Sequence, residues 1–381
     1  MIHPARIRAL NSASGRTGSY VLYWMQQAQR TICNHALEYA IREANDRKLP
    51  VVVAFGITDD YPEANERHYA FMLEGLRDVE LALRRRNIPF VVRHKSPELT
   101  AVELSRNAAL LVCDRGYLKI QKAWRTYVAT HAHCPVVQVE TDVVVPVETA
   151  SNKEEFAART IRPKITRLLG DFLQPLAEST PRHQSAAPKF DSLDVTNVDA
   201  LLARLKIDRS VTRVSRYIGG QAEAARRMDQ FAASKLAAYA EDRNEPALEG
   251  VSHMSPYLHF GQVSPLDLAL RIRGSRHHAG VEAYLEEMIV RRELSMNFVH
   301  FNPRYDHFEC LPPWARQTLG DHQRDERPYV YTLEQLEAGG THDPYWNAAQ
   351  REMTATGKMH NYMRMYWGKK ILEWSPTPQQ A

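Results

Sequence analysis

The N-terminal part of the chain alternates short apolar runs with longer amphipathic segments. Segments such as residues 34–45 (NHALEYAIREAN) and 67–86 repeat apolar positions at helical spacing. Between these segments lie five runs rich in Val, Leu and aromatic residues, each with the length of a buried strand: residues 20–25, 51–55, 90–92, 110–113 and 136–139. Strands that alternate with helices indicate an α/β domain built on a doubly wound parallel sheet.

A sheet of this kind usually binds its ligand beyond the carboxyl ends of the strands. The loops at residues 56–65 (GITDDYPEAN) and 114–118 (DRGYL) follow the second and fourth runs and are therefore expected at that edge. The sequence contains neither GxGxxG nor GxxxxGK[ST], so it has no standard dinucleotide fingerprint and no P-loop.

After a Pro- and Ser-rich stretch at residues 176–196, the strand signals fade and helical patterns dominate, at residues 221–243, 264–274, 281–300 and 359–374. We therefore predict three parts: an α/β domain over residues 1–172, a linker over residues 173–210, and an all-α domain over residues 211–381.

Composition places the 381-residue chain among soluble globular proteins, with 44% hydrophobic and 25% charged residues. The formal net charge of +4 permits a polyanionic partner without requiring one. Two basic clusters stand out, Arg84 to Arg86 and Arg271 to His278, although a solvated surface is the simpler interpretation of either cluster alone.

The four cysteines are widely spaced and form no CxxC pair, so we expect no disulfide framework and no metal site. The first ten residues lack the apolar region of a signal peptide, and no apolar run approaches the ~18 residues that span a bilayer. The expectation is a cytoplasmic protein without membrane contact, associated with the nucleoid if the source is bacterial.

Residues 359–374 (MHNYMRMYWGKKILEW) form an unusual helical segment. Projected at 100° per residue, the segment is apolar over most of its circumference, which predicts a buried helix. Asn361 and Arg364 would then need polar partners. A polar ligand is one such partner, and an ordinary core helix with Arg364 paired to a carboxylate is the alternative.

Two further segments carry candidate chemistry. In residues 250–265, Ser252 precedes Ser255-Pro256, which suit the N-cap and N1 positions of a helix. Hydroxyls before a helix N-terminus suit a phosphate, although plain capping is the better explanation of the Ser-Pro pair alone. In residues 286–294, Glu287 and Arg291 stand four apart, where a surface ion pair is usual and a carboxylate aimed into a pocket is the alternative. Together, the three segments describe a pocket for a large planar, phosphorylated cofactor, and FAD fits that description.

Long stretches of the chain resemble the class II cyclobutane pyrimidine dimer photolyases, of the photolyase/cryptochrome family. The matching stretches run from residue 6 to residue 374 and include RIRALN, YVLYWMQQAQR, NHALEYAI, FGITDDYPEANERHYAFMLEGL, SPYLHFGQVSP, LEEMIVRREL and TGKMHNYMRMYWGKKILEW. The resemblance implies an α/β antenna domain, a helical FAD domain, and light-driven splitting of cyclobutane pyrimidine dimers in double-stranded DNA by an electron from reduced FAD. It also implies a lesion flipped out of the duplex. We expect a monomer.

The resemblance also assigns residues. In the catalytic group, Glu287 matches the glutamate that hydrogen-bonds the dimer, and Met365 matches the methionine that touches it. Trp367 and Trp346 match the tryptophan chain that photoreduces FAD, with Trp374 as a possible branch. The FAD-binding residues are Tyr239, Ser252, His253, Met254, Ser255, Asn361 and Arg364. Arg291 and Arg292 are expected to contact DNA or the lesion. An antenna chromophore, a deazaflavin or a folate, is implied without a motif that selects one.

Family members continue through a further helical stretch containing a motif similar to Leu-Asp-Gly-Arg-Asp-Pro-Asn-Gly-Tyr. That stretch supplies groups near the flavin, so the chain looks C-terminally truncated, and we expect it to bind FAD poorly and to repair DNA weakly. Two alternatives stay open: a cryptochrome-like blue-light receptor, and a flavin-free inactive fragment.

Overall fold

A six-stranded sheet forms the core of the N-terminal part in a computed structural model that describes residues 2–15 and 17–381. The strand order is β1-β6-β5-β2-β3-β4, and all neighbours are parallel except β1 with β6. The strands are β1 (Ile7–Ala9), β2 (Tyr20–Trp24), β3 (Val51–Ile57), β4 (Phe90–His94), β5 (Ala108–Asp114) and β6 (Val136–Val139). The five predicted strands are confirmed. The pattern missed β1, a three-residue strand at the antiparallel edge after the short 3-10 turn η1 (Pro4–Arg6).

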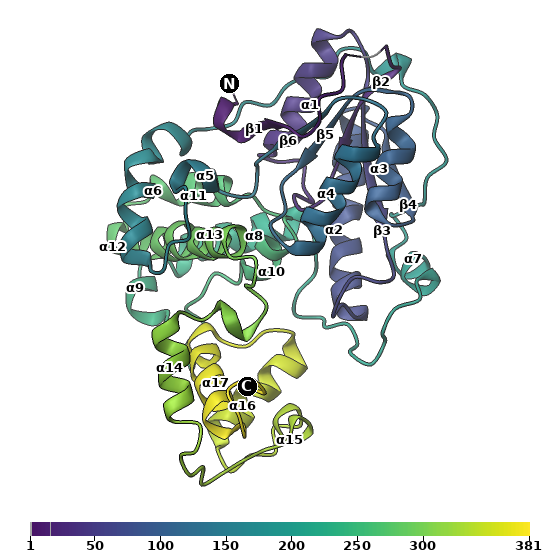
Figure 1. Cartoon of the computed structure of the whole chain (residues 1–381). Coiled ribbons are helices and arrows are strands. Elements are labelled where there is room, and N and C mark those ends of the chain that lie inside the picture. Colours follow the sequence, from purple (N-terminus) through teal and green to yellow (C-terminus); the bar gives the residue numbers. More distant parts are fainter. Residues whose placement is uncertain (1, 16) are drawn as a thin grey trace.

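Helices cover both faces of this sheet. Alternate residues of β2 enter different cores: Val21 and Tyr23 join the first hydrophobic cluster with α1 (His35–Asp46) and α2 (Glu66–Arg85). Leu22 and Trp24 instead join the cluster that receives α3 (Pro97–Ser105) and α4 (Lys119–His131). Burial on both faces explains why the strands are continuous apolar runs. The doubly wound α/β fold is thus confirmed, and Figure 1 shows the helices on either side of the sheet.

Helices that follow β6 pack into a separate core. They are α5 (Val147–Ala150), α6 (Ala158–Phe172), α8 (Gln221–Ser234), α9 (Tyr239–Asp242), α10 (Ser255–His259), α11 (Pro265–Arg273), α12 (His278–Leu285), the π-helical turn η3 (Glu286–Arg291) and α13 (Arg292–Phe301). The predicted helix 221–243 is broken between Ser234 and Tyr239. Because Ala158, Ile161 and Ile165 belong to this helical core, we propose a domain boundary near residue 142 in place of residue 172.

The expected linker lies against the sheet domain over part of its length. It contains η2 (Gln184–Ala186) and α7 (Val198–Arg204), and the apolar side chains of α7 join the core beneath α2. Asn197 caps α7 by accepting a hydrogen bond from the N–H of Ala200 at 3.1 Å. We therefore propose that α7 belongs with the α/β domain.

The C-terminal segment forms a lobe at the bottom of Figure 1. It follows η4 (Phe308–Cys310) and consists of α14 (Pro313–Asp321), α15 (Leu333–Glu337), α16 (Pro344–Thr356) and α17 (Asn361–Trp374). Its small core contains Leu336, Trp346 and Trp374. The prediction that α17 is buried is wrong: Met365 is 55% exposed and Tyr362 is 46% exposed. An apolar circumference does not decide burial when few elements pack against a helix.

The sheet domain and the helical region meet through buried charges. The carboxylate of Asp142, which is 1% exposed, accepts hydrogen bonds from two guanidinium groups. Arg30 donates to Oδ1 at 3.4 Å, and Arg292 donates to Oδ2 at 2.8 Å. Arg30, which is fully buried, also donates to the backbone oxygen of Gly261 at 2.9 Å. The two parts are thus joined by hydrogen bonds as well as by apolar contact.

Within residues 2–15 and 17–381, no helix combines the length and the apolar character that crossing a bilayer requires. Over the same residues, no cluster of three or more His, Cys, Asp or Glu side chains is arranged to hold a metal ion.

Candidate functional site

The loop before α10 holds a network of charged and polar side chains. Both ring nitrogens of His253 have a hydrogen-bond partner. Glu249 Oε2 lies 3.0 Å from Nε2, and the hydroxyl oxygen of Tyr217 lies 2.9 Å from Nδ1. Its backbone is left-handed, with φ of 59°, a conformation that a non-glycine residue keeps only where its surroundings demand it. Burial, together with the nearby Lys358 ammonium, lowers the pKa of His253 to about 4, so the ring is neutral at pH 7.

Ser252 and Met254 lie in the same loop, in contact with an aromatic cluster. The hydroxyl of Tyr284 donates to Ser252 Oγ at 3.2 Å, and the Tyr284 ring meets Tyr239 at 5.4 Å. Met254 is buried and takes the N-cap position of α10, whereas Ser255 is the first helical residue. The prediction that Ser255 is the N-cap is therefore wrong by one residue, and the Ser255 side chain makes no capping bond.

Lys358, just before α17, reaches this loop from the C-terminal lobe. Its ammonium lies 3.2 Å from Nδ1 of His253. Burial, with the nearby Arg364 charge, lowers the pKa of Lys358 to about 8. Arg364 itself is exposed and donates a hydrogen bond to Asn361 Oδ1 at 2.6 Å, so the prediction that it is buried is wrong. Its side-chain partner in this structure is an amide, in place of the carboxylate that was one of the two alternatives. Sequence reasoning missed Lys358, because one lysine in a polar turn gives no signal.

Glu287 lies in the π-helical turn that joins α12 to α13. Its Oε1 accepts from the Arg243 guanidinium at 2.7 Å, and its side chain is about a third exposed. Arg291 instead donates to Glu286 Oε1 at 3.2 Å, five positions back. The expected i,i+4 pair between Glu287 and Arg291 is therefore absent: the wider turn shifts the partner by one residue. Glu287 therefore pairs with Arg243, the C-cap residue of α9, and not with a residue of its own turn.

The carboxylate of Glu287 also affects Tyr239. Burial, with the Glu287 charge as the next cause, raises the pKa of the Tyr239 hydroxyl. Tyr239 is 7% exposed and packs edge-to-face on Phe231 at 5.4 Å. The structure thus brings together Glu287, Tyr239 and, through Tyr284, Ser252.

Arg292 does not join this group. Its guanidinium donates to the backbone oxygen and to Oδ2 of Asp142, both at 2.8 Å. It is largely buried at the junction with the sheet domain. Arg292 is thus already paired within the protein, and its contact with DNA or a lesion stays a prediction, as does that of Arg291, whose side chain is 54% exposed.

The predicted tryptophans form a contiguous stack in the C-terminal lobe. The Trp346 and Trp367 rings are parallel within 2°, with centroids 5.2 Å apart. Trp374 meets Trp346 edge-to-face at 5.4 Å. Trp346 is fully buried and its Nε1 has no hydrogen-bond partner within the described chain, whereas Trp367 Nε1 donates to Gln350 Oε1 at 3.2 Å. The three tryptophans that the resemblance assigned to an electron-transfer chain thus adjoin one another, while their role in photoreduction stays a prediction.

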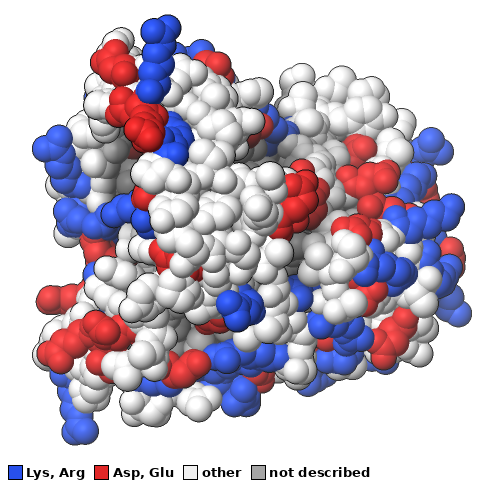
Figure 2. Space-filling model, turned by 90° about the horizontal axis from the view of Figure 1, so that it is seen from below, with Lys and Arg blue, Asp and Glu red and all other residues white. Residues whose placement is uncertain are grey.

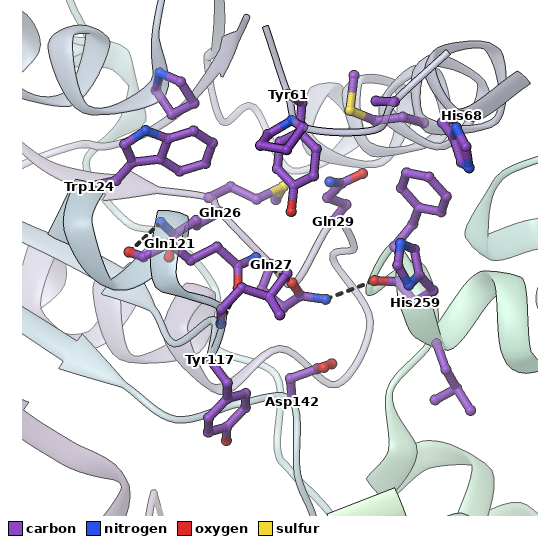
Figure 3. A pocket seen from close by; sticks show the side chains of 18 of the residues that line it. Gln26, Gln27, Gln29, Tyr61, His68, Tyr117, Gln121, Trp124, Asp142 and His259 are labelled. Carbon is purple, nitrogen blue, oxygen red and sulfur yellow. Dashed lines mark hydrogen bonds between the residues drawn. The ribbon is translucent and has the colours of Figure 1, made fainter. Parts of the chain in front are cut away.

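A cavity of about 640 Å³ opens where the parallel strands end, between the sheet domain and the helical region. The two loops that were expected at this edge contribute Ile57, Thr58, Tyr61, Tyr117 and Leu118 to its wall. Figure 3 shows Tyr61 and Trp124 on one side of the cavity, Tyr117 and Asp142 on the other, and glutamines between them.

The polar groups of the cavity are mostly amides. Gln27 Nε2 donates to the backbone oxygen of His259 at 2.9 Å, and Gln121 Nε2 donates to Gln27 Oε1 at 2.7 Å. Gln26 Nε2 donates to the backbone oxygen of Gln121 at 3.2 Å, as Figure 3 also shows. Sequence reasoning did not find these glutamines, since an amide after a strand has no signature of its own.

Comparison with known proteins gives consistent results. The sequence model of the family described as DNA photolyase matches residues 21–182. A deoxyribodipyrimidine photo-lyase of Methanothermobacter thermautotrophicus is 50% identical, with 100% of this chain and 84% of that protein covered. A deoxyribodipyrimidine photo-lyase of Arabidopsis thaliana is 37% identical, with coverages of 100% and 80%.

Solved structures share the fold. A class III photolyase from Agrobacterium tumefaciens has a TM-score of 0.70 at 19% identity and is matched over 95% of this chain and 74% of that one. The cryptochrome of Synechocystis sp. PCC6803 has a TM-score of 0.73 at 13% identity, with coverages of 96% and 80%.

Proposed function

The chain belongs to the DNA photolyase family, and from this premise we propose that it is a light-driven lyase that splits cyclobutane pyrimidine dimers in DNA. The observation that supports this proposal best is the Trp346–Trp367 stack, which lies in the same lobe as Lys358, the residue that reaches the 249–255 loop. Packing alone does not require two parallel indoles. Assignment to class II rests on the sequence stretches given above and is part of the proposal.

The residues present fit FAD. A diphosphate needs several hydrogen-bond donors, and the Lys358 ammonium, the Ser252 hydroxyl and the Arg364 guanidinium supply them. The Nε2 atom of His360 is buried without a partner in the described chain, close to the same donors. Tyr239, His253, Met254, Ser255 and Asn361 are proposed as further FAD-binding residues. Bound FAD would supply light absorption and the transferred electron.

We assign the lesion side to Glu287, Met365 and Arg291. The Arg243 guanidinium holds the Glu287 carboxylate in position at 2.7 Å, so that its second oxygen, Oε2, can accept from a pyrimidine N–H. Met365 is 55% exposed and offers an apolar contact for a flipped base. Arg291 is proposed for the DNA backbone.

The cavity at the strand ends is the proposed antenna site. Its walls are mostly apolar and aromatic with a few convergent amides, as is typical of sites for planar organic ligands. A deazaflavin and a folate both carry amide groups that glutamines recognise, and the cavity residues do not choose between them.

DNA would meet a mixed surface. Figure 2 shows a mostly uncharged centre on the face seen from below, with Lys and Arg side chains toward the edges and interspersed Asp and Glu. Phosphate contacts at such edges predict that affinity falls as salt rises. We propose damaged double-stranded DNA as the partner and a monomeric protein, located in the cytoplasm.

One experiment tests the proposal. The purified protein is scanned from about 300 to 700 nm for flavin bands and then incubated under blue light, with reductant, with an oligonucleotide that contains a thymine dimer. Dimer loss that needs light supports the lyase. Flavin bands with no dimer loss favour the cryptochrome-like receptor. A colourless protein that cannot be reconstituted with FAD favours an inactive, flavin-free protein.

The pKa of Lys358 gives a pH-dependent prediction. Below about pH 8, Lys358 of the free protein is already a charged ammonium, the form that a diphosphate favours. Above pH 8 the side chain is a neutral amine, so Lys358 must take up a proton when the diphosphate binds. Flavin affinity should therefore fall as pH rises from 8 to 9, by up to roughly tenfold per unit. Fluorescence titration with FAD at several pH values measures this affinity.

The replacement Lys358→Met should weaken flavin binding at pH 7 and flatten the pH dependence. The exposed neighbour Lys369 provides the matched control, since Lys369→Met should keep both the affinity and its pH dependence. A Lys358→Met protein that retains the full loss between pH 8 and pH 9 would contradict the assignment.

A further inference from the structure

The C-terminal lobe, taken as residues 311–381, is joined to the rest of the molecule by few polar contacts. Over residues 2–15 and 17–381, the side-chain hydrogen bonds that link this lobe to the other parts of the chain come from Arg67 and Lys358. The lobe has a small apolar core of its own, and Figure 1 shows it set apart below the helical region. The orientation of the lobe therefore depends strongly on these two side chains.

Arg67 lies in the first turn of α2 and caps a helix of the lobe. Its Nη1 donates to the carbonyl oxygen of Met353 at 3.3 Å, and its Nη2 donates to that of Thr354 at 2.9 Å. Both carbonyls belong to the last turn of α16, where partners from outside the helix are needed and a positive charge is favoured. The guanidinium is planar and forked, so it can bind two carbonyl oxygens at once.

The helix that carries Arg67 does not explain its position. A cation in the first turn of α2 lies at the positive end of the dipole of that helix, which is unfavourable. The side chain is instead held by other elements: its Nε donates to the carbonyl oxygen of Thr212 at 3.0 Å, and its backbone N–H donates to that of Val211 at 3.3 Å. The guanidinium is thus fixed between the 211–212 segment and the end of α16.

The turn that follows α16 is short and well ordered. Gly357 has a left-handed backbone, with φ of 83°, and its N–H donates to the carbonyl oxygen of Met353 at 2.8 Å. The backbone N–H of Lys358 donates to Thr356 Oγ1 at 3.3 Å, and the Lys358 ammonium lies 3.2 Å from Nδ1 of His253. Because this turn is fixed by hydrogen bonds, a displacement of the end of α16 also displaces the ammonium.

We propose that Arg67 is a positioning residue: by capping α16 it holds Lys358 at the 249–255 loop, so that a side chain of the α/β domain sets the geometry of a lysine in the C-terminal lobe. Arg67 does not touch the flavin itself and acts through Lys358. The inference rests on the proposed function, in which Lys358 and this loop bind the diphosphate of FAD.

The pH dependence of flavin binding tests the proposal. FAD titrations compare the parent protein with Arg67→Met between pH 7 and pH 9. We expect Arg67→Met to bind FAD at least about fivefold more weakly at pH 7 and to lose most of the decrease between pH 8 and pH 9, since that decrease comes from Lys358. A substitution that merely loosened the fold would lower the affinity by the same factor at every pH, and that result overturns the proposal.

Two further variants serve as controls. Arg84→Met removes a guanidinium near the other end of α2, where its partner is Glu80, and should leave flavin affinity and its pH dependence unchanged. Arg67→Lys keeps a cation at the end of α16 and should recover part of the loss. Circular dichroism confirms that each variant is folded. Recovery in Arg67→Lys supports the proposal, whereas equal effects of Arg84→Met and Arg67→Met overturn it.

A second arm needs no flavin. Acetylation by acetic anhydride, followed by mass spectrometry, gives the titration midpoint of Lys358, with the exposed Lys369 as an internal reference. In the parent the pKa of Lys358 is about 8, and in Arg67→Met the midpoint should rise by at least about one unit toward the ordinary lysine value. If the parent binds no FAD while this rise is observed, the proposed function fails and the positioning of Lys358 by Arg67 stands. An unchanged midpoint overturns the inference.

Discussion

Replacing Glu287 by glutamine is expected to slow dimer splitting about 10- to 100-fold, because a hydrogen bond to a charged group contributes about 1.5–3 kcal/mol. The amide oxygen can still accept from Arg243, so the local structure should persist. The rate is measured on a thymine-dimer oligonucleotide under single-turnover illumination, with flavin content and DNA affinity determined separately.

Glu286 provides an adjacent control in the same π turn. It accepts from Arg162 at 2.7 and 3.0 Å and from Arg291 at 3.2 Å, away from Glu287. Glu286→Gln should therefore leave the splitting rate within about twofold, since partly exposed ion pairs contribute little. Equal losses in both variants would contradict the role assigned to Glu287 and indicate a general effect on the turn.

Much of the fold follows from the sequence for a clear physical reason. A parallel strand covered on both faces must be apolar throughout, so β3 and β5 are visible as continuous runs. The position of the cavity followed from the same topology, because all parallel strands end at one edge. By contrast, β1 has three residues with exposed or half-exposed side chains and carries no such pattern.

The site was harder to predict because its partners are set by tertiary structure. Periodicity paired Glu287 with Arg291, and the π turn moved the pairing to Glu286. No residue pattern marks a π turn. Arg292 met Asp142, 150 positions away, and no local rule indicates that contact. Only the family resemblance pointed to Trp346 and Trp367 as neighbours, since indoles at these positions are equally consistent with ordinary packing.

The junction between the two domains should depend strongly on Asp142. Asp142→Ala leaves Arg30 and Arg292 without their shared carboxylate, and removing one partner of a buried ion pair costs about 3–5 kcal/mol. We expect this loss in the free energy of unfolding, measured by urea titration with tryptophan fluorescence. Because Asp142 also lines the cavity, antenna binding should weaken in the same protein.

Two companion variants separate lost charge pairing from other effects of the substitution. Asp306→Ala breaks an exposed pair with Lys119 and should cost less than about 1 kcal/mol. Adding Arg292→Met to Asp142→Ala removes one of the stranded charges and should restore part of the lost stability, since the two side chains are in contact and their effects do not add. The comparison needs Arg292→Met alone as well. If the double variant loses as much free energy of unfolding as Asp142→Ala and Arg292→Met lose together, the loss comes from packing around Asp142. In that case, pairing of the buried charges does not stabilise the junction between the helical region and the sheet domain.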